Sequence, residues 1–180
     1  MLRFAPAAAL LGLCVTVASA KDDTMLKVKV GDKFPDEPLT AAQIDKVKKG
    51  AKTLSISDLK GKIVVVFFYP KADTPGCTVE SCGFRDKAKD FPKDVVLLGA
   101  SIDDKLAQDA FIKKFDLPMP LLCDTDSKLV KDLGILNPKN SRAQRVTFVV
   151  DKEGKIAKIY EKVTPKGHPD EVLAFVKTLK

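Results

Sequence analysis

Two cysteines five residues apart, Cys77 and Cys82, are the side chains in this 180-residue chain best suited to do chemistry. They come directly after the polar segment Thr-Pro-Gly, which itself follows a run of apolar residues. A thiolate is a nucleophile and a metal ligand, and two thiols can be oxidised to a disulfide. The pair is therefore a structural disulfide, half of a metal site or a redox-active couple, and the surrounding residues help to separate these uses.

The residues around Cys77 predict that it lies at the N-terminus of a helix. An apolar strand ends at about Phe68, Pro70 stops it, and residues 74–76 turn the chain into a helical pattern that begins near Cys77. Unpaired backbone N–H groups and the helix dipole favour an anion at such a position. Because Thr-Pro-Gly-Cys-Thr is too polar for a core segment, we expect Cys77 to be an exposed, nucleophilic thiolate rather than a buried apolar residue.

The spacing of the two cysteines argues against a permanent disulfide. Residues five apart in an ideal helix have Cα atoms ~8.6 Å apart. A disulfide requires a Cα separation of roughly 4.4 to 6.8 Å. If residues 77–82 are helical when reduced, the pair can form a disulfide only after about one turn unwinds. The spacing thus predicts a switch between a reduced helix and an oxidised loop.

Metal binding and other cysteine chemistry fit the sequence less well. A zinc site would need two more ligands, and the chain offers only Cys123 and His168, neither of which belongs to a second closely spaced couple. A thioredoxin-type reductase would have Cys-x-x-Cys instead of Cys-x4-Cys. His168 is the only histidine and opens a helical pattern, so we expect it at the surface or as a helix cap, and a Cys–His hydrolase is the weaker enzyme hypothesis. No metal or other cofactor is expected.

Residues 1–20 have the layout of a secretory signal peptide. Arg3 precedes an apolar stretch from residue 5 to residue 17, and Ala-Ser-Ala at 18–20 leads into a polar segment. The alternative is a membrane anchor, but crossing a bilayer needs ~20 apolar residues. An organelle transit peptide would carry more arginine and serine. We therefore expect cleavage after residue 20, export to the periplasm or the outside of the cell, and one mature domain at residues 21–180.

Composition limits the other functions open to this domain. The net charge of +7 comes from lysines that are spread along the chain and interleaved with acidic residues, and the chain has no tryptophan. A nucleic-acid surface would cluster its cations with stacking aromatic side chains. Three cysteines remain after cleavage, whereas an exported protein stabilised by disulfides carries an even and larger number. The sequence thus favours cysteine chemistry and no nucleic-acid partner.

The alternation of apolar runs with helical patterns predicts an α/β domain with a mixed central β-sheet and helices on both faces. Unbroken runs of β-branched and aromatic residues indicate strands buried on both faces. Such runs lie at 64–68, 95–100 and 146–150. A further strand at 156–160 follows the polar turn 151–155, so the last two strands are expected to form an antiparallel hairpin.

Helical patterns occupy the segments between these strands. The first includes Phe84, the second follows an N-cap at Asp103 or Asp104, a short one stops at Gly134, and the last opens at His168. Residues 35–52 are ambiguous, since the part from 41 to 49 fits either a short helix or an irregular, lysine-rich loop.

The run from Phe68 to Thr78, together with Glu80 and the segment 82–86, resembles the peroxiredoxins, and specifically the peroxiredoxin Q or bacterioferritin comigratory protein subfamily. The similarity extends from about Val30 to Lys180 and is most specific at Pro-x-x-x-Thr-x-x-Cys. It implies a thioredoxin-like fold and a thiol-dependent peroxidase that reduces hydrogen peroxide and organic hydroperoxides. Residues 39–53 depart from the family, which usually has a short hairpin there.

The resemblance also implies a role for each matching residue. Cys77 corresponds to the peroxidatic cysteine, Cys82 to the resolving cysteine, Thr74 to a hydroxyl beside the sulfur, Pro70 to the residue that shapes and shields the pocket, and Arg145 to the active-site arginine. A Cys77–Cys82 disulfide would then be reduced by a thioredoxin-like dithiol. The subfamily is often monomeric, and no membrane association is expected after cleavage of the leader.

Some roles stay open at this point. Glu80 is one helical turn from Cys77 and either orients Arg145 or is a solvated helix residue. Cys123 is either a packing residue at a buried strand end or an alternative resolving thiol. The whole protein is either a peroxidase or a non-catalytic redox sensor or thiol-switch binding protein that uses the same cysteine pair.

Overall fold

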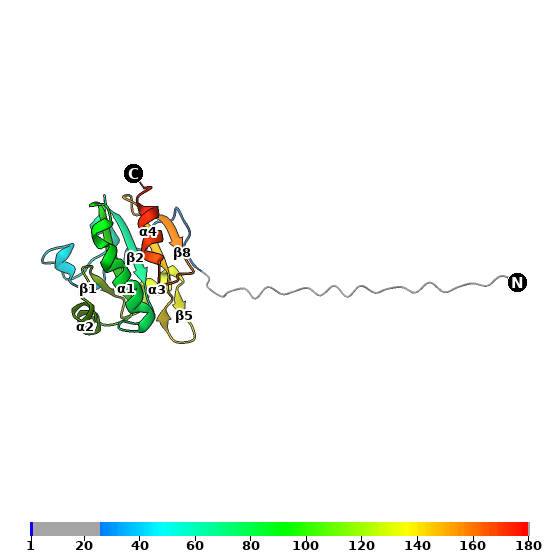
Figure 1. The fold of residues 1–180 in the computed structure, drawn as a ribbon, viewed down its shortest axis with the longest axis horizontal. Helices are drawn as coiled ribbons and strands as arrows, with labels where there is room; N and C mark the ends of the chain where they lie inside the picture. The colour runs from blue at the N-terminus through cyan, green and yellow to red at the C-terminus, as the bar shows by residue number, and fades with distance from the viewer. Residues whose placement is uncertain (2–25, 180) are drawn as a thin grey trace.

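The computed structural model describes Met1 and residues 26–179, and its centre is a six-stranded mixed sheet in the order β1-β4-β3-β2-β7-β8 (Figure 1). Strands β2, β3 and β4 are parallel to one another, whereas β1 pairs antiparallel with β4, and β7 pairs antiparallel with both β2 and β8. The strands are β1 Thr40–Ala42, β2 Ile63–Phe68, β3 Val95–Ser101, β4 Leu121–Cys123, β7 Thr147–Val150 and β8 Ile156–Tyr160. A separate two-stranded pair joins β5 Leu136–Asn137 to β6 Arg142–Ala143.

Strand β2 is one of the two central strands of this sheet and is buried along its whole length. Its side chains alternate between two core clusters: residues 63, 65 and 67 pack on one face of the sheet, and residues 64, 66 and 68 pack on the other. This alternation confirms the prediction that the unbroken apolar run is a strand buried on both faces. The antiparallel β7–β8 hairpin was also predicted correctly.

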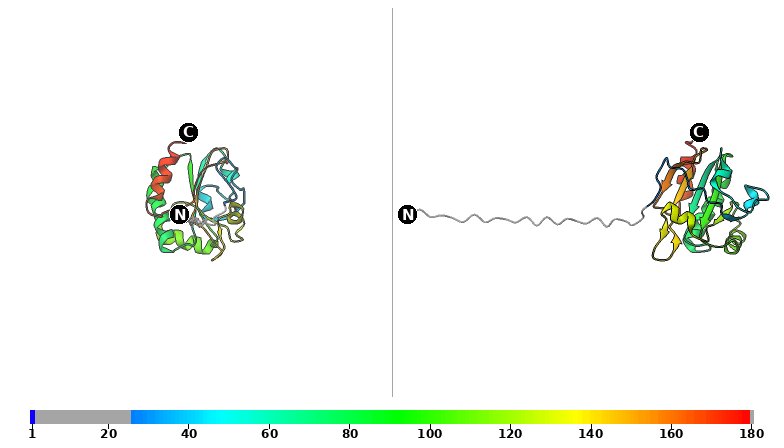
Figure 2. Two further views of the ribbon diagram at one scale, coloured as in Figure 1. Left: turned by 90° about the vertical axis from the view of Figure 1, so that its right-hand side faces the viewer. Right: turned by 180° about the vertical axis from the view of Figure 1, so that it is seen from behind.

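Helices cover both faces of the sheet, as predicted, but unevenly (Figure 2). Helices α1 (Pro75–Lys87), α2 (Lys105–Phe115) and α4 (His168–Val176) contribute their apolar residues to one core cluster. The other cluster is covered by the short α3 (Lys128–Leu133) and the 3-10 helix η2 (Ile56–Leu59). Two further 3-10 helices are η1 (Ile44–Lys46) and η3 (Ala88–Asp90).

The signals that begin and end these helices act as the sequence indicated. Asp104 precedes α2, and its carboxylate accepts a hydrogen bond from the Ala107 N–H at 2.8 Å. Gly134 ends α3 with a positive φ of 76°, a conformation that glycine adopts without strain. Helix α1 begins at Pro75, two residues before the expected start. Proline fits the first helical position because its missing N–H would have no helical partner there.

The ambiguous N-terminal region is mostly irregular, with two short elements. Strand β1 pairs with β4 at the edge of the sheet, and η1 follows it after Gln43. The short-helix alternative is therefore correct only for the single turn of η1. Apart from Met1, the predicted signal peptide lies outside the described residues. Among the residues that the structure describes, no helix is both long and apolar enough to span a membrane.

Candidate active site

Cys77 lies in the first turn of α1, as predicted, but it is buried and not exposed. Only 1% of its surface is accessible, and it belongs to the core cluster that also contains Phe67, Tyr69 and Ala72. The helix buries only some of the residues in this segment. Pro75 and Val79 are exposed and Thr78 is half-buried, whereas Cys77 and Glu80 are buried. The expectation of an exposed thiolate was wrong because it judged the segment by its average polarity.

Arg145 places its guanidinium against the sulfur of Cys77. Its Nη2 donates a hydrogen bond to Sγ at 3.2 Å, although 68 residues separate the two in the sequence. The pairing of β2 with β7 brings them together: Phe68 N–H donates to the carbonyl of Val146 at 2.8 Å, so Arg145 lies beside the end of β2 that leads into α1. A guanidinium is a permanently charged hydrogen-bond donor, so this contact holds a positive group against the sulfur.

Glu80 is fully buried one helical turn after Cys77 and accepts a hydrogen bond from Nη1 of Arg145. The solvated-residue alternative is therefore wrong. Burial raises the pKa of Glu80 to about 7, against the opposing attraction of Arg145, and its Oε1 atom has no hydrogen-bond partner among the described residues. Burial lowers the pKa of Arg145, but Glu80 and the sulfur outweigh it and raise that pKa overall. The guanidinium is thus held charged, with one nitrogen on a carboxylate and another on the sulfur.

The raised pKa of Glu80 predicts how the free energy of unfolding depends on pH. Its pKa in the folded protein is about 7, above the ordinary value of 4.5. The folded state therefore holds a proton that the unfolded chain releases between these two pH values, so the free energy of unfolding falls as the pH rises through this window. We expect Glu80→Gln to remove this slope. Relative to wild type, the variant should gain up to about 3 kcal/mol between pH 4.5 and pH 8, because one pKa unit corresponds to about 1.4 kcal/mol.

Urea denaturation at a series of pH values measures this difference. Glu153→Gln, which replaces an exposed glutamate, controls for the loss of one carboxylate from the chain. Parallel curves for wild type and Glu80→Gln between pH 4.5 and pH 8 would contradict the assignment.

Thr74 and Pro70 lie in the segment between β2 and α1. Thr74 is the residue before the first helical turn; its hydroxyl donates to the carbonyl of Lys71 at 3.0 Å and accepts no hydrogen bond from a helix N–H. Pro70 is half-buried and follows the last residues of β2. Both residues are therefore close to Cys77 along the chain, and the Thr74 hydroxyl is engaged by the backbone of its own loop.

Cys82 lies in the same helix as Cys77 and is half-buried. Helix α1 runs without interruption through both residues, and both are free thiols. Five helical residues separate Cα atoms by ~8.6 Å, which is beyond the range of a disulfide. The structure is thus the reduced helix of the predicted switch.

A buried hydrogen-bond chain that the sequence did not reveal lies beneath the β2–α1 loop. Tyr69 donates from its hydroxyl to Oε1 of Gln108 at 2.6 Å, and Gln108 donates from Nε2 to the Ser101 hydroxyl at 2.8 Å. Asp103 accepts from Ser101 at 2.7 Å and from the Ala72 N–H at 2.8 Å. Buried polar groups need such partners. The tyrosine directly after a buried strand was therefore a sequence signal for a buried hydrogen bond, although its partners could not be read from the sequence.

His168 is buried within the domain, so the prediction of a surface or capping role was wrong. Its Nε2 lies 2.8 Å from the hydroxyl of Thr147, and its ring packs edge-on against Phe84 and Tyr160. Burial lowers the pKa of His168 despite the opposing effect of Glu171. His168 is the first residue of α4, and its ring packs against α1 and the β7–β8 hairpin.

Cys123 ends β4, as the sequence suggested, and is buried. Its Sγ lies 3.8 Å from the carbonyl of Leu121, and burial raises the pKa of its thiol. A buried, protonated thiol is a poor nucleophile. The surroundings of Cys123 thus favour the packing role over that of an alternative resolving thiol.

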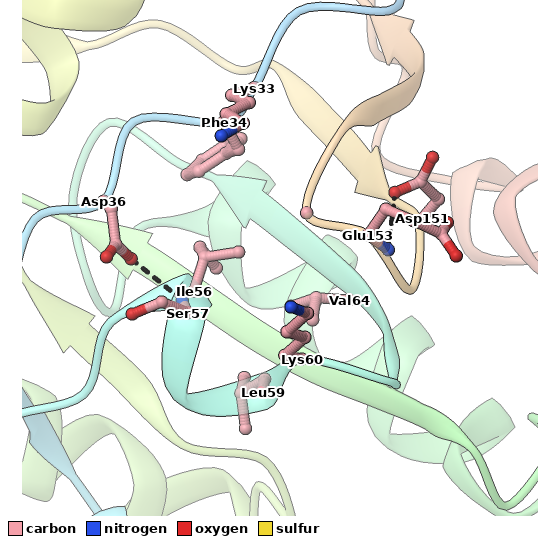
Figure 3. A pocket seen from close by; sticks show the side chains of 11 residues that line it. Lys33, Phe34, Asp36, Ile56, Ser57, Leu59, Lys60, Val64, Asp151 and Glu153 are labelled. Atoms are coloured by element: carbon pink, nitrogen blue, oxygen red, sulfur yellow. Dashed lines mark hydrogen bonds between the residues drawn. The ribbon is translucent and has the colours of Figure 1, made fainter.

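A cavity of about 240 Å³ lies on the opposite face of the sheet (Figure 3). Its floor includes Phe34, Ile56 and Val64, which belong to the core cluster that does not contain Cys77. Asp36 at its rim is already bonded to the N–H of Ser57 at 2.8 Å. This cavity is separate from the cysteine site. Within the described part of the chain, no group of three or more His, Cys, Asp or Glu side chains is arranged to hold a metal ion.

The fold and the site together define a class of protein. The Cys77 thiol lies in the first turn of a helix that packs on a mixed sheet, and an arginine from another segment donates a hydrogen bond to its sulfur. This arrangement is typical of a thiol-dependent oxidoreductase. The AhpC/TSA family matches residues 30–159, and the chain belongs to this family.

Curated relatives and solved structures agree with this family. The chain is 39% identical over 155 residues to the putative peroxiredoxin bcp of Coxiella burnetii, covering 82% of this chain and 98% of the relative. It is 38% identical over 165 residues to the chloroplastic peroxiredoxin Q of Populus jackii, covering 90% of this chain and 74% of that protein.

The fold is similar to that of a mutant of PrxQ from Xylella fastidiosa, with a TM-score of 0.74 and 27% identity, covering 83% of this chain and 96% of that one. For Xanthomonas campestris peroxiredoxin Q the TM-score is 0.73 at 29% identity, over 85% and 97% of the two chains. The predicted thioredoxin-like fold is confirmed. The protein is a thiol-dependent peroxidase, an oxidoreductase that acts on peroxides at the expense of a thiol reductant.

Proposed function

We propose that Cys77 is the thiol that attacks the peroxide, and that the substrates are hydrogen peroxide and organic hydroperoxides. The observation that supports this most directly is the hydrogen bond from Arg145 Nη2 to the Cys77 sulfur at 3.2 Å. The thiolate attacks one peroxide oxygen, the O–O bond breaks, and the second oxygen leaves as hydroxide or alkoxide. Cys77 becomes a sulfenic acid.

Negative charge moves from sulfur to oxygen during this step, so the site must stabilise both atoms. A site that stabilised the thiolate alone would slow the reaction. The Arg145 guanidinium and the free N–H groups in the first turn of α1 are donors that remain fixed while the charge moves. Glu80 is proposed to orient Arg145, and Thr74 and Pro70 are proposed to shape the approach to the sulfur on the loop side.

Cys82 is proposed to resolve the sulfenic acid. Its thiol attacks the oxidised sulfur of Cys77, a disulfide forms, and the oxygen leaves as water. The first turns of α1 must unwind for this step because the helix holds the two sulfurs apart. The rest of α1 is anchored: Phe84 stacks on Phe67 with ring centroids 4.4 Å apart, and Lys87 pairs with Asp170 at 2.7 Å. Unwinding is therefore proposed to stop before Phe84.

A thioredoxin-like dithiol is proposed to complete the cycle. Its two thiols become a disulfide while Cys77 and Cys82 return to thiols, so electrons and protons balance. Residues 1–20 are proposed to be a signal peptide that exports the domain of residues 21–180 to the periplasm or beyond, and the mature domain is proposed to be a monomer. The donor is then a dithiol protein of that compartment.

The Cys82→Ser variant tests the proposed cycle. In stopped-flow experiments on the reduced protein from residue 21 onward, it should consume one equivalent of hydrogen peroxide and then stall in the presence of a dithiol protein reductant. The sulfenic acid at Cys77 would persist and be trapped by dimedone, with a mass increase confined to the peptide that contains Cys77. Sustained turnover by Cys82→Ser with the same reductant would contradict the resolving role of Cys82.

The alternative function is a non-catalytic redox sensor or thiol-switch binding protein. It shares the same buried thiol and the same helix, and it differs in rate and in partner. Slow peroxide turnover by wild type with the reductant present, together with a mixed disulfide to a client protein, would favour the sensor over the peroxidase.

A further inference from the structure

A glycine lies where the first turn of α1 passes the guanidinium of Arg145. Gly76 is half-buried and directly precedes Cys77. A Cβ atom built on Gly76 would lie 3.3 Å from Nη2 of Arg145 and 3.9 Å from Cγ of Pro165, in the loop between β8 and α4. That Nη2 atom is the one that donates to the Cys77 sulfur. The hydrogen bond between Arg145 and the Cys77 sulfur therefore lies next to Gly76, the residue of this turn that has no side chain.

Backbone geometry does not explain this glycine. The glycines with positive φ, where side chains are disfavoured, are at positions 31, 50, 61, 134, 154 and 167, and Gly76 is not one of them. It lies inside α1, where alanine is the better helix former and glycine weakens the helix. An alanine would thus suit the backbone at this position, and the neighbouring guanidinium is what it would disturb.

The guanidinium has little freedom to move away from an added methyl group. Its Nη1 atom is bonded to the buried carboxylate of Glu80, and its side chain is only 18% exposed. At 3.3 Å from a new Cβ, Nη2 would have to shift by a few tenths of an ångström. Because the hydrogen bond to Glu80 holds Nη1 in place, the shift would distort the hydrogen bond between Nη2 and the Cys77 sulfur.

We propose that Gly76 is a positioning residue, which acts through Arg145 by leaving the space that lets Nη2 reach the Cys77 sulfur. This inference rests on the proposed role of Cys77 as the attacking thiol. Gly76 does not touch the reacting atoms; it sets how closely the guanidinium approaches them. A side chain at position 76 should therefore slow the reaction with peroxide without weakening the fold.

The test compares two glycines of the same helix. Gly76→Ala should lower the second-order rate constant for hydrogen peroxide by roughly 3- to 10-fold, since misplacing a catalytic group by ~1 Å can lower a rate about 100-fold and the shift here is a few tenths of an ångström. Its urea midpoint should equal or exceed that of wild type. Gly83→Ala is the matched control: its Cβ would lie 2.8 Å from Cγ of Pro169 in α4, so the urea midpoint should fall while the rate constant stays within about twofold.

A double-mutant cycle shows whether Gly76 acts through the arginine. Arg145→Lys, which shortens the reach to the sulfur, should lower the rate constant about 100-fold in the wild-type background. In the Gly76→Ala background the same change should lower it by a clearly smaller factor, because the contact is already weakened. In the Gly83→Ala background it should retain its full effect. Gly76→Ser places the same Cβ and serves if Gly76→Ala does not fold.

The outcomes separate this inference from the proposed function. A wild-type protein whose Cys77 does not react with hydrogen peroxide would overturn the proposed function. A wild-type protein that reacts, with a Gly76→Ala variant that reacts equally fast, would overturn the positioning role alone. Equal factors for Arg145→Lys in the wild-type and Gly76→Ala backgrounds would also overturn it.

Discussion

Replacing Cys77 with serine is expected to abolish peroxide consumption. A serine hydroxyl is not ionised near neutral pH and cannot form a sulfenic acid, so the first bond to a peroxide oxygen would not form. The loss should be complete for hydrogen peroxide and for an alkyl hydroperoxide alike, because the proposed mechanism uses the same sulfur for both. Stopped-flow mixing of the reduced protein with each peroxide, followed by assay of the peroxide left, measures the effect.

Cys123→Ser is the matched control for this experiment, since Cys123 is also a buried thiol but lies in β4 and not in α1. Its rate constant should remain close to that of wild type. Retention of more than a trace of peroxide consumption by Cys77→Ser, or its loss in Cys123→Ser, would show that the attacking thiol had been misassigned.

Replacing Arg145 with methionine is the second change with a large expected effect. Methionine keeps much of the length and volume of the side chain but removes both donors, so neither the Cys77 sulfur nor the Glu80 carboxylate would keep its hydrogen bond. Removing one preorganised donor from a reaction that moves charge typically lowers the rate about 100- to 1000-fold. We expect a fall of at least that size in the second-order rate constant for hydrogen peroxide.

The matched control is Arg142→Met, which removes a half-buried arginine three residues earlier in β6. It should leave the rate constant within about twofold of wild type. An Arg145→Met variant that reacts as fast as Arg142→Met would mean that the guanidinium has only a structural role at the sulfur. Circular dichroism of both variants checks that each remains folded.

Local sequence determined the strands β2, β3, β7 and β8, the helix that carries Cys77 and the spacing of the two cysteines. The apolar run of β2 is unmistakable because a strand buried on both faces excludes polar residues. Pro75 begins α1, and the five-residue spacing then fixes how far apart Cys77 and Cys82 lie in a helix. These features depend on near neighbours in the chain, so they could be read without a structure.

Short strands and buried polar residues could not be read in this way. Strand β1 has only three residues, too few to show a period, and it is a strand because it pairs with β4 at the edge of the sheet. A surface position was expected for His168 and left open for Glu80, because charged and polar residues are mostly exposed in folded proteins. Each is buried because a partner from a distant segment accompanies it, Arg145 for Glu80 and Thr147 for His168.

The contact between Arg145 and the Cys77 sulfur is decided by the tertiary structure. Only the antiparallel pairing of β2 with β7 carries Arg145 to a sulfur 68 residues away, and only the packing of α1 on the sheet buries Cys77 beneath it. Local sequence fixes which side chains are present and how the nearest ones are spaced. Contact between distant side chains depends on how buried strands pair, and many registers satisfy the same apolar pattern until the whole sheet is assembled.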